Sequence, residues 1–429
     1  MHTVKVVTLG CSKNLVDSER VLKMLSNAGL DAVHEGDGYA NIVIINTCGF
    51  IGDAKEESVN TILEYAEAKN NGKIEELYVM GCLSERYRDE LQKEIHEVDR
   101  FYGKFDWTTI ADDLSRKHGH PSLCYDRTIT TPSHHAYLKI AEGCNRFCAF
   151  CAIPLITGRY KSRPIEEIED EVRMLVGRGV KEFNVIAQDL SGYGQDLYGV
   201  QKLPELVDRL SRIEGVKWIR LHYAYPAQFP MEVMDVMANR PNVCAYLDIA
   251  LQHISDKVLL NMRRHITADE TRALLAEMRR RVPGLHIRTT LMTGFPGETE
   301  EDFEELLRFV EEQRFERMGA FAYCEEEGTY GAENYDDSIP EDVKQKRLDR
   351  LMDLQERISM ELQQQKIGHR LEVVIDREEE EFYVGRTQWD SPEVDPEVLV
   401  KKDRTLMIGG FYEVEVKEAL PFELIAVVV

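Results

Sequence analysis

The sequence lacks the features that mark exported and membrane proteins. Its 429 residues open without a cationic segment followed by an apolar core, and no run reaches the roughly 18 apolar residues of a membrane helix. We therefore expect a cytoplasmic protein with no membrane partner. In a reducing compartment its nine cysteines are predicted to be ligands or free thiols rather than disulfides.

Cations are also scarce. The chain has 53 Lys and Arg against 77 Asp and Glu, which gives a net charge of -24. Affinity for nucleic acid depends largely on neutralising phosphates, so this deficit argues against RNA as the macromolecular substrate and for a basic partner. The length predicts two or three domains rather than one core.

The densest group of cysteines is Cys144, Cys148 and Cys151, spaced four and then three positions apart. Three thiolates this close can hold three irons of a cubane cluster and leave the fourth iron open to a substrate or cofactor. A zinc site would more naturally show two CxxC pairs or a Cys/His set. The alternative is three buried thiols that pack as small hydrophobic side chains.

This stretch resembles the CxxxCxxC signature of the radical S-adenosylmethionine superfamily, including Phe150 before the last cysteine. The resemblance implies a 4Fe-4S cluster on Cys144, Cys148 and Cys151, with S-adenosylmethionine on the open iron. Enzymes of this kind cleave the cofactor to methionine and a 5'-deoxyadenosyl radical. The protein then supplies binding, orientation and exclusion of water.

Three further cysteines lie in residues 1–130, where short apolar runs alternate with amphipathic stretches. This pattern predicts an open parallel α/β sheet domain. Cys11, Cys48 and Cys82 each follow the carboxyl end of a predicted strand, and ligands bind at that edge of such sheets. The three thiols could therefore converge, although three independent core or loop cysteines would give the same spacing.

Two phrases around these cysteines resemble the amino-terminal domain of the methylthiotransferases. They are TLGCSKNLVDSE, which starts at Thr8, and NTCGFI, which starts at Asn46. The resemblance implies that Cys11, Cys48 and Cys82 bind a second 4Fe-4S cluster that serves sulfur insertion. The motif CSKNLVDSE is most similar to the ribosomal-protein branch of the family, because members of the tRNA-modifying branch usually have the sequence GCQMN at this position.

Residues 131–366 alternate strand-like runs with helical patterns. Six such units predict a partial (βα)6 barrel with its site at the carboxyl ends of the strands, which resembles the core of the superfamily. A helical pattern from Pro340 to about Lys366 is predicted to pack on it. Cys244 and Cys324 lie within strand patterns and are predicted core thiols.

The loops after these strands are expected to line the cofactor pocket. On the family resemblance we assign cofactor binding to Gln188 and Asp189 after the second strand, Gln252 after the fourth and Gly294 after the fifth. The glycine permits close backbone approach, but this turn lacks the Lys-Ser/Thr ending of a phosphate loop. His253 is more readily explained as a satisfied polar residue than as a catalytic one.

Residues 367–429 contain five strand-like runs separated by charged turns, a pattern that predicts a small antiparallel β-barrel. Its position and size resemble the TRAM domain that ends the methylthiotransferases. TRAM domains commonly bind RNA, but this one has 15 acidic and 7 basic residues, with an unbroken run over 378–381. Although such a run can be only a solvated turn, the wider excess would repel tRNA and attract a basic ribosomal protein.

The family implies the function. We expect methylthiolation of the β-carbon of an aspartate in ribosomal small-subunit protein uS12, using two 4Fe-4S clusters, S-adenosylmethionine and a reduced flavodoxin- or ferredoxin-type electron donor. The first alternative is a tRNA adenosine methylthiotransferase, which the charge opposes. The second is an iron-sulfur sensor or scaffold without catalytic activity, which would not cleave S-adenosylmethionine.

Overall fold

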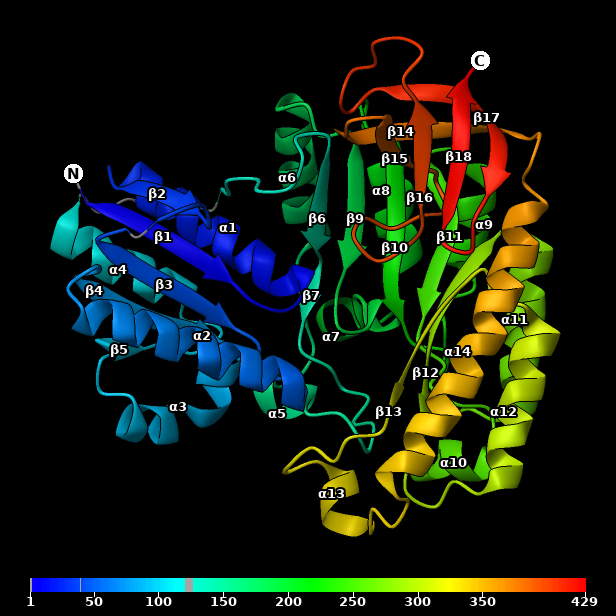
Figure 1. Ribbon diagram of the computed structural model, residues 1–429, viewed down its shortest axis with the longest axis horizontal. Coiled ribbons are helices and arrows are strands. Elements are labelled where there is room, and N and C mark those ends of the chain that lie inside the picture. The colour runs from blue at the N-terminus through cyan, green and yellow to red at the C-terminus, as the bar shows by residue number, and fades with distance from the viewer. Residues whose placement is uncertain (1, 39, 120–125) are drawn as a thin grey trace.

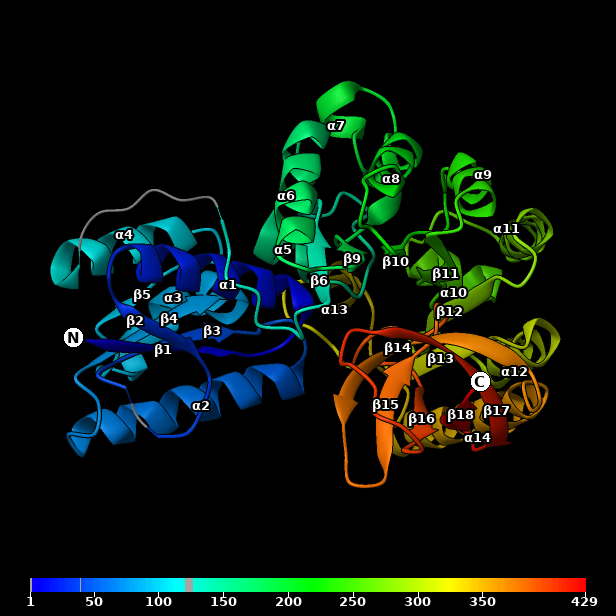
Figure 2. The ribbon, with the colours of Figure 1, turned by 90° about the horizontal axis from the view of Figure 1, so that it is seen from above.

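Three principal sheets organise the chain, for which the computed structural model describes residues 2–38, 40–119 and 126–429 (Figures 1 and 2). A sheet of five strands comes first, a sheet of six strands follows, and a closed barrel of five strands ends the chain. Cys124 lies outside the described residues. Within those residues, no helix is both long and apolar enough to cross a membrane.

The amino-terminal sheet is a layer of parallel strands between two pairs of helices. Its strand order is β2-β1-β3-β4-β5. Successive side chains point to opposite faces, so Ile42 and Ile44 pack with α1 and α4, while Val43 and Ile45 pack with α2 and α3. The elements are β1 (Thr3–Thr8), α1 (Ser12–Asn27), β2 (Asp31–His34), β3 (Ile42–Thr47), α2 (Gly52–Asn70), β4 (Glu76–Gly81), α3 (Cys82–Glu94), β5 (Arg100–Phe101) and α4 (Trp107–His118).

The central sheet is parallel and keeps the order of the chain, from β6 at one edge to β13 at the other. Helices cover one face in an arc (Figure 2), and Ile219, Leu247 and Ile287 contribute to the core there. The predicted partial barrel is confirmed: the sheet curves without closing. Its strands are β6 (His135–Lys139), β9 (Glu182–Ile186), β10 (Trp218–Ala224), β11 (Val243–Ile249), β12 (His286–Thr293) and β13 (Arg317–Ala322).

Helices and short strands connect these six strands. The covering helices are α6 (Ile165–Gly177), α8 (Leu203–Ser211), α9 (Glu232–Asn239), α11 (Ala268–Arg281) and α12 (Glu300–Gln313). The smaller elements are β7 (Ala141–Glu142), α5 (Ile153–Thr157), β8 (Lys161–Ser162), a 3-10 turn (Leu190–Gly192), α7 (Gln195–Tyr198), α10 (Asp256–Asn261) and α13 (Tyr330–Asn334). Figure 1 shows α10 and α13 beyond the carboxyl ends of the central strands.

A long helix, α14 (Glu341–Gln364), leads into the closed barrel. The barrel order is β14-β15-β16-β18-β17, and its pairs are antiparallel except β16 with β18, which is parallel. The run over 378–381 is exposed: Glu378 ends the first strand, and residues 379–381 form the turn to the second. The strands are β14 (Arg370–Glu378), β15 (Phe382–Arg386), β16 (Glu397–Lys401), β17 (Phe411–Ala419) and β18 (Glu423–Val428).

The barrel docks over the amino ends of the central strands (Figure 1). Trp218 meets Phe411 edge to face with ring centroids 4.9 Å apart. Beside them the fully buried Glu182 accepts hydrogen bonds from Arg386 of the barrel at 2.8 Å and from Arg220 of β10 at 3.0 Å. Charges buried in this way are stable only when paired, so these contacts tie the two domains together.

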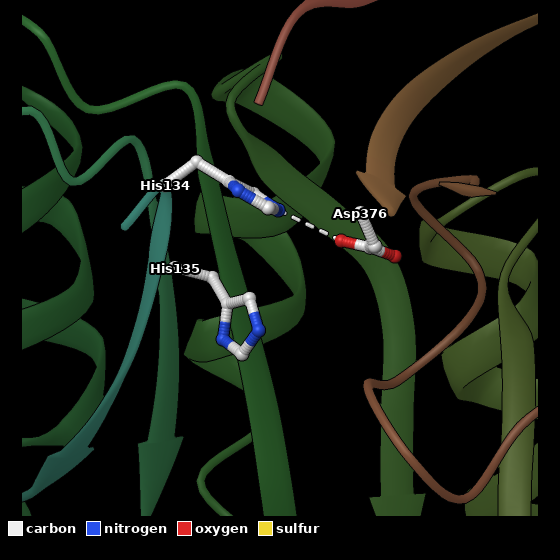
Figure 3. A group of neighbouring side chains, drawn as sticks. All are labelled: His134, His135 and Asp376. Carbon is white, nitrogen blue, oxygen red and sulfur yellow. Dashed lines mark hydrogen bonds and ion pairs between the residues drawn. The ribbon is translucent and has the colours of Figure 1, made fainter. Parts of the chain in front are cut away.

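Two histidines at the start of β6 face this junction (Figure 3). His134 Nε2 lies 2.7 Å from Asp376 Oδ1, and ligand atoms of His134, His135 and Asp376 all lie within 4.8 Å of one another, close enough for a metal ion. However, Arg386 already donates to both oxygens of Asp376, at 2.6 and 2.8 Å. Because a guanidinium repels a second cation, we interpret this cluster as a structural junction.

The sequence interpretation missed some elements and one environment. The edge strands β2 and β5 and the helix α4 were not predicted, since short edge strands carry little alternation. Cys244 is buried, as predicted. The prediction of a core position for Cys324 is wrong: β13 ends at Ala322, and Cys324 lies exposed in the loop that follows.

Candidate functional site

Each cysteine of the amino-terminal triad follows a strand of the first sheet. Cys11 precedes α1 after β1, Cys48 follows β3 directly, and Cys82 opens α3 after β4. Since β1, β3 and β4 are parallel neighbours, their carboxyl ends meet at one edge of the sheet. The three thiols therefore lie at the same edge, although 37 and 34 residues separate them in the chain.

Glycines beside these cysteines allow the three loops to touch. A Cβ at Gly10, where φ is +89°, would lie 2.7 Å from Cys48 Cβ. A Cβ at Gly49 would lie 2.7 Å from the backbone of Leu83. Only a residue without a side chain fits such approaches. The glycines of the Gly-Cys and Cys-Gly pairs thus bring the cysteine loops into contact.

A buried asparagine fastens the same loops. Asn14 Nδ2 donates to Leu9 O at 3.0 Å and to Thr47 O at 3.1 Å. Asn14 Oδ1 lies 3.7 Å from Cys82 Sγ. The amide therefore contacts the loops after β1, β3 and β4 at once. Buried polar groups need such partners, which gives the asparagine of the CSKN phrase a structural role.

The central triad lies in the loop between β7 and α5. Cys144 N donates to Gly158 O at 3.2 Å, and Cys151 N donates to Cys148 O at 3.1 Å. Arg264 Nη1 lies 3.2 Å from Cys148 Sγ. These contacts fold the loop back on itself, and it presents its thiols at the carboxyl end of the central sheet, where sites of such barrels lie.

Both triads face a single cavity of about 330 Å³. Its lining includes Cys11, Cys48, Cys82, Cys144, Cys148 and Cys151. Two sets of three thiols, each too small to complete a four-coordinate metal site, match the ligand chemistry of iron-sulfur clusters with one open iron each. The arrangement can therefore hold two metal groups that face a shared space.

Burial opposes ionisation of these thiols, but at Cys11 the nearby Lys13 and Lys104 outweigh it and lower the pKa. Burial raises the pKa of Cys82 to about 12, although nearby Lys104 opposes the shift. It raises the pKa of Cys144 to about 12 as well. Both groups are therefore thiols at neutral pH when no metal is bound. Since metals bind the thiolate, loading either triad releases protons.

A buried network of charges joins the amino-terminal domain to the central sheet beside the cavity. Lys104 Nζ lies 3.3 Å from Asp17 Oδ2 on α1. Asp17 also pairs with Lys139 of β6, whose ammonium lies 2.8 Å from Glu142 Oε2. Burial alone would raise the pKa of Glu142, but Lys139 and Lys104 lower it to about 2. Because each charge has a partner, the network can hold the two domains at a fixed separation.

Three of the four predicted cofactor residues line the cavity, namely Gln188, Asp189 and Gln252. The side-chain oxygens of Gln188 and Gln252 are buried and have no hydrogen-bond partner among the described residues. Buried acceptors without partners indicate a missing donor, such as the ammonium of an amino acid moiety. Asp189 instead accepts from Arg146 Nε at 2.6 Å and from Ser191 N at 2.8 Å.

Gly294 does not lie among the residues that line this cavity. Its N–H donates to Glu298 Oε2 at 2.9 Å, and a Cβ at this position would meet Lys344 Cγ at 2.4 Å. His253 is fully buried, with Nε2 3.4 Å from the same Glu298 oxygen. Its Nδ1 accepts from Ser255 N at 3.0 Å. Both residues therefore support the turn after β12.

Several lining residues were missed by sequence reasoning. Tyr225 lies between two guanidinium groups, with Arg146 and Arg264 each 4.2 Å from its ring centroid. Lys13 and Lys104 also line the cavity. Lys13 lies inside the CSKN phrase and could have been noticed there, whereas Tyr225, Arg264 and Lys104 have no local sequence signal because only the fold brings them to the thiols.

Comparison with known families divides the chain into three parts. Residues 138–310 match the Radical SAM superfamily, residues 367–429 match the TRAM domain, and residues 3–103 match the uncharacterized protein family UPF0004. Among solved structures, the radical S-adenosylmethionine methyltransferase TsrM from Kitasatospora setae superposes with a TM-score of 0.58 at 14% identity, covering 75% of each chain. That likeness confirms the fold.

Full-length relatives are much more similar. The ribosomal protein uS12 methylthiotransferase RimO of Bacteroides fragilis is 60% identical over 98% of both chains. The RimO protein of Porphyromonas gingivalis is 59% identical over 100% of this chain and 99% of its own. Similarity of this extent over the whole length establishes the relationship. The chain belongs to the family of ribosomal protein uS12 methylthiotransferases known as RimO.

Proposed function

We propose that this protein is a radical S-adenosylmethionine enzyme that methylthiolates the β-carbon of an aspartate residue of ribosomal protein uS12. The observation that carries the proposal is the convergence of two cysteine triads on one cavity. A C–H bond without a leaving group must first lose a hydrogen atom, and acid-base side chains cannot remove it. A second group must then hold the sulfur within reach of the same carbon.

The residues present fit two 4Fe-4S clusters and S-adenosylmethionine. Cys144, Cys148 and Cys151 would hold the cluster of the radical site, and the amino-terminal triad would hold the cluster that serves sulfur insertion. When bound, these groups supply hydrogen abstraction, sulfur and a methyl group. The unpartnered oxygens of Gln188 and Gln252 would accept hydrogen bonds from the amine of the cofactor.

The protein's own contribution is position and exclusion of water. Asn14 and the glycine contacts hold the amino-terminal thiols together. The network of Lys104, Asp17, Lys139 and Glu142 fixes that group against the central sheet. A buried and rigid arrangement protects a reactive radical from solvent, so we expect hydrogen abstraction and sulfur transfer to occur within the same cavity.

We propose the following domain boundaries and partners. Residues 1–130 form the methylthiotransferase amino-terminal domain, residues 131–366 the radical core and residues 367–429 the TRAM domain. The family matches at residues 3–103, 138–310 and 367–429 support this division. We further propose a cytoplasmic location, in keeping with a ribosomal protein substrate, and a reduced flavodoxin- or ferredoxin-type electron donor.

The acidic TRAM domain supports a protein substrate over the tRNA alternative, but only part of its charge is available. Asp376, Asp390 and Asp395 are engaged with arginines at the junction with the central sheet. Glu380 and Glu381 in the first turn remain exposed and have no ion pair among the described residues. These exposed negative charges repel the phosphates of an RNA and attract a basic ribosomal protein.

Mass spectrometry tests the proposal directly. Ribosomal proteins from cells with and without this gene are compared, and we expect an added methylthio group on the uS12 aspartate only when the gene is present. The reduced, iron-loaded protein should also produce 5'-deoxyadenosine from S-adenosylmethionine. A methylthio group found instead on tRNA adenosine would favour a tRNA adenosine methylthiotransferase. If the protein does not cleave S-adenosylmethionine, an iron-sulfur sensor or scaffold without catalytic activity becomes the favoured function.

A further inference from the structure

Lys13 is a buried cation of the cavity lining that makes no ion pair with the residues the structure describes. Lys13 is only 9% exposed and lines the same cavity as the two triads. Among the residues that the structure describes, its ammonium makes no hydrogen bond or ion pair. It lies 3.3 Å from the ring centroid of Tyr223 and acts electrostatically, at longer range, on Cys11 and Asp248. A buried charge without a counter-ion is costly, so this arrangement requires an explanation.

The other cations of the cavity lining all have partners. Lys104 pairs with Asp17, and Arg146 pairs with Asp189. Arg264 donates to Cys148 Sγ and to a backbone carbonyl. Arg264 also lacks a carboxylate partner among the described residues, and its buried Nε has no hydrogen-bond partner there. Of these two lining cations, Lys13 is the one whose charged group makes no hydrogen bond at all within the described chain.

The ring beneath Lys13 is held in an unusual backbone conformation. Tyr223 has φ of +65°, a region that side chains other than glycine rarely occupy. The register between β10 and β11 also shifts at this point, between Leu221 and Ala224. Local strain of this kind persists only where the surrounding structure enforces it, often at functional sites. Here the unusual backbone conformation places the face of the Tyr223 ring under the Lys13 ammonium. A cation-π contact then holds the ammonium in place.

Lys13 also lies between the two halves of the site. It is two residues from Cys11 in the amino-terminal domain, while Tyr223 is the last residue but one of β10 in the central sheet. The nearby Asp248 is paired with Arg288 at 3.5 Å. An anion bound by Lys13 would therefore lie in the space that both triads face.

We propose that Lys13 binds the side-chain carboxylate of the substrate aspartate and so selects an anionic residue for modification. The inference rests on the proposed function, in which the reacting β-carbon is bonded directly to that carboxylate. Binding would supply the missing counter-ion and place the β-carbon within the cavity.

Binding and turnover measurements on matched substrates test this assignment. The iron-loaded wild type, Lys13→Met and Lys13→Arg are compared using uS12 and a uS12 variant with asparagine in place of the target aspartate. For the wild type we expect aspartate to bind about 10- to 100-fold more tightly, the range of a charge-assisted hydrogen bond. Lys13→Met should lose this preference, mainly through KM, and Lys13→Arg should keep part of it.

The control is Lys23→Met, which removes the same charge from the same helix about 15 Å farther along. It should leave the preference for aspartate intact. The proposal fails if Lys13→Met still prefers aspartate, or if it weakens both substrates equally while losing iron, which would make Lys13 a counter-charge for the thiols only. Absence of uS12 modification by the wild type would instead refute the proposed function, and the binding comparison would still decide the role of Lys13.

Discussion

The two cysteine triads reach the same cavity by opposite routes. The central triad lies within eight residues of one loop, which hydrogen bonds fold back on itself. The amino-terminal triad is assembled from three separate loops that only a parallel sheet brings together. The first geometry is local and the second depends on tertiary structure, so the two triads should respond differently to changes in packing.

Removing each triad separately gives the largest expected effect. The Cys144→Ala, Cys148→Ala, Cys151→Ala variant should lose S-adenosylmethionine cleavage by at least about 1,000-fold, or about 4 kcal/mol. The Cys11→Ala, Cys48→Ala, Cys82→Ala variant should still form 5'-deoxyadenosine but no methylthio product. Iron analysis should find about four irons per chain in each. Retention of about eight irons by either variant would contradict the two-cluster assignment.

Lys104→Met tests whether the amino-terminal triad depends on the interface between domains. The change removes one of the two buried cationic partners of Asp17, which keeps Lys139, so we expect a loss of about 1.5–3 kcal/mol, the range of a charged hydrogen bond. Urea unfolding should show this loss, together with less iron at the amino-terminal triad. Lys69→Met removes a partly exposed partner of Asp99 in the same domain, and should cost no more than about 1 kcal/mol. Equal losses for the two variants would argue against a buried network.

Gly10→Ala tests the contact between loops of the amino-terminal triad. The new Cβ would lie 2.7 Å from Cys48 Cβ at a backbone φ of +89°, and we expect a loss of about 1–3 kcal/mol with reduced iron at this triad alone. Gly72→Ala has a similar positive φ but nothing within 4 Å. It measures the backbone strain by itself, and if it lowers iron equally, the contact with Cys48 is unimportant.

Acid is expected to destabilise the fold through a buried histidine at the amino end of β6. Burial, aided by Arg386, lowers the pKa of His135 from 6.5 to about 4. Below pH 6.5 the unfolded chain therefore binds a proton that the folded chain does not, so stability is lost as pH falls toward 4. The loss should be about 1 kcal/mol at pH 5.5. Urea unfolding of His135→Gln should show a flatter pH dependence, and the exposed His369→Gln should match the wild type.

The sequence predicted what local patterns encode. The loop of Cys144 to Cys151, the strand ends before Cys11, Cys48 and Cys82, and the strand-helix repeats were all visible, because period and spacing are local properties. The ion-pair partners of Lys104 could not be predicted from the sequence, because they lie on α1 and in the central domain and only the fold brings them together. Gly294 was assigned to the cavity by its place after a strand, yet its turn packs on α14 instead.

The single amide of Asn14, which spans all three amino-terminal loops, has a consequence for assembly. Where the apo protein already holds its ligands in place, iron enters a preformed cradle and little conformational entropy is lost on loading. Small zinc domains behave oppositely, because their metal supplies the folding energy. Chelation should accordingly strip this site without unfolding the sheet beneath it, so the emptied protein can be refilled rather than discarded.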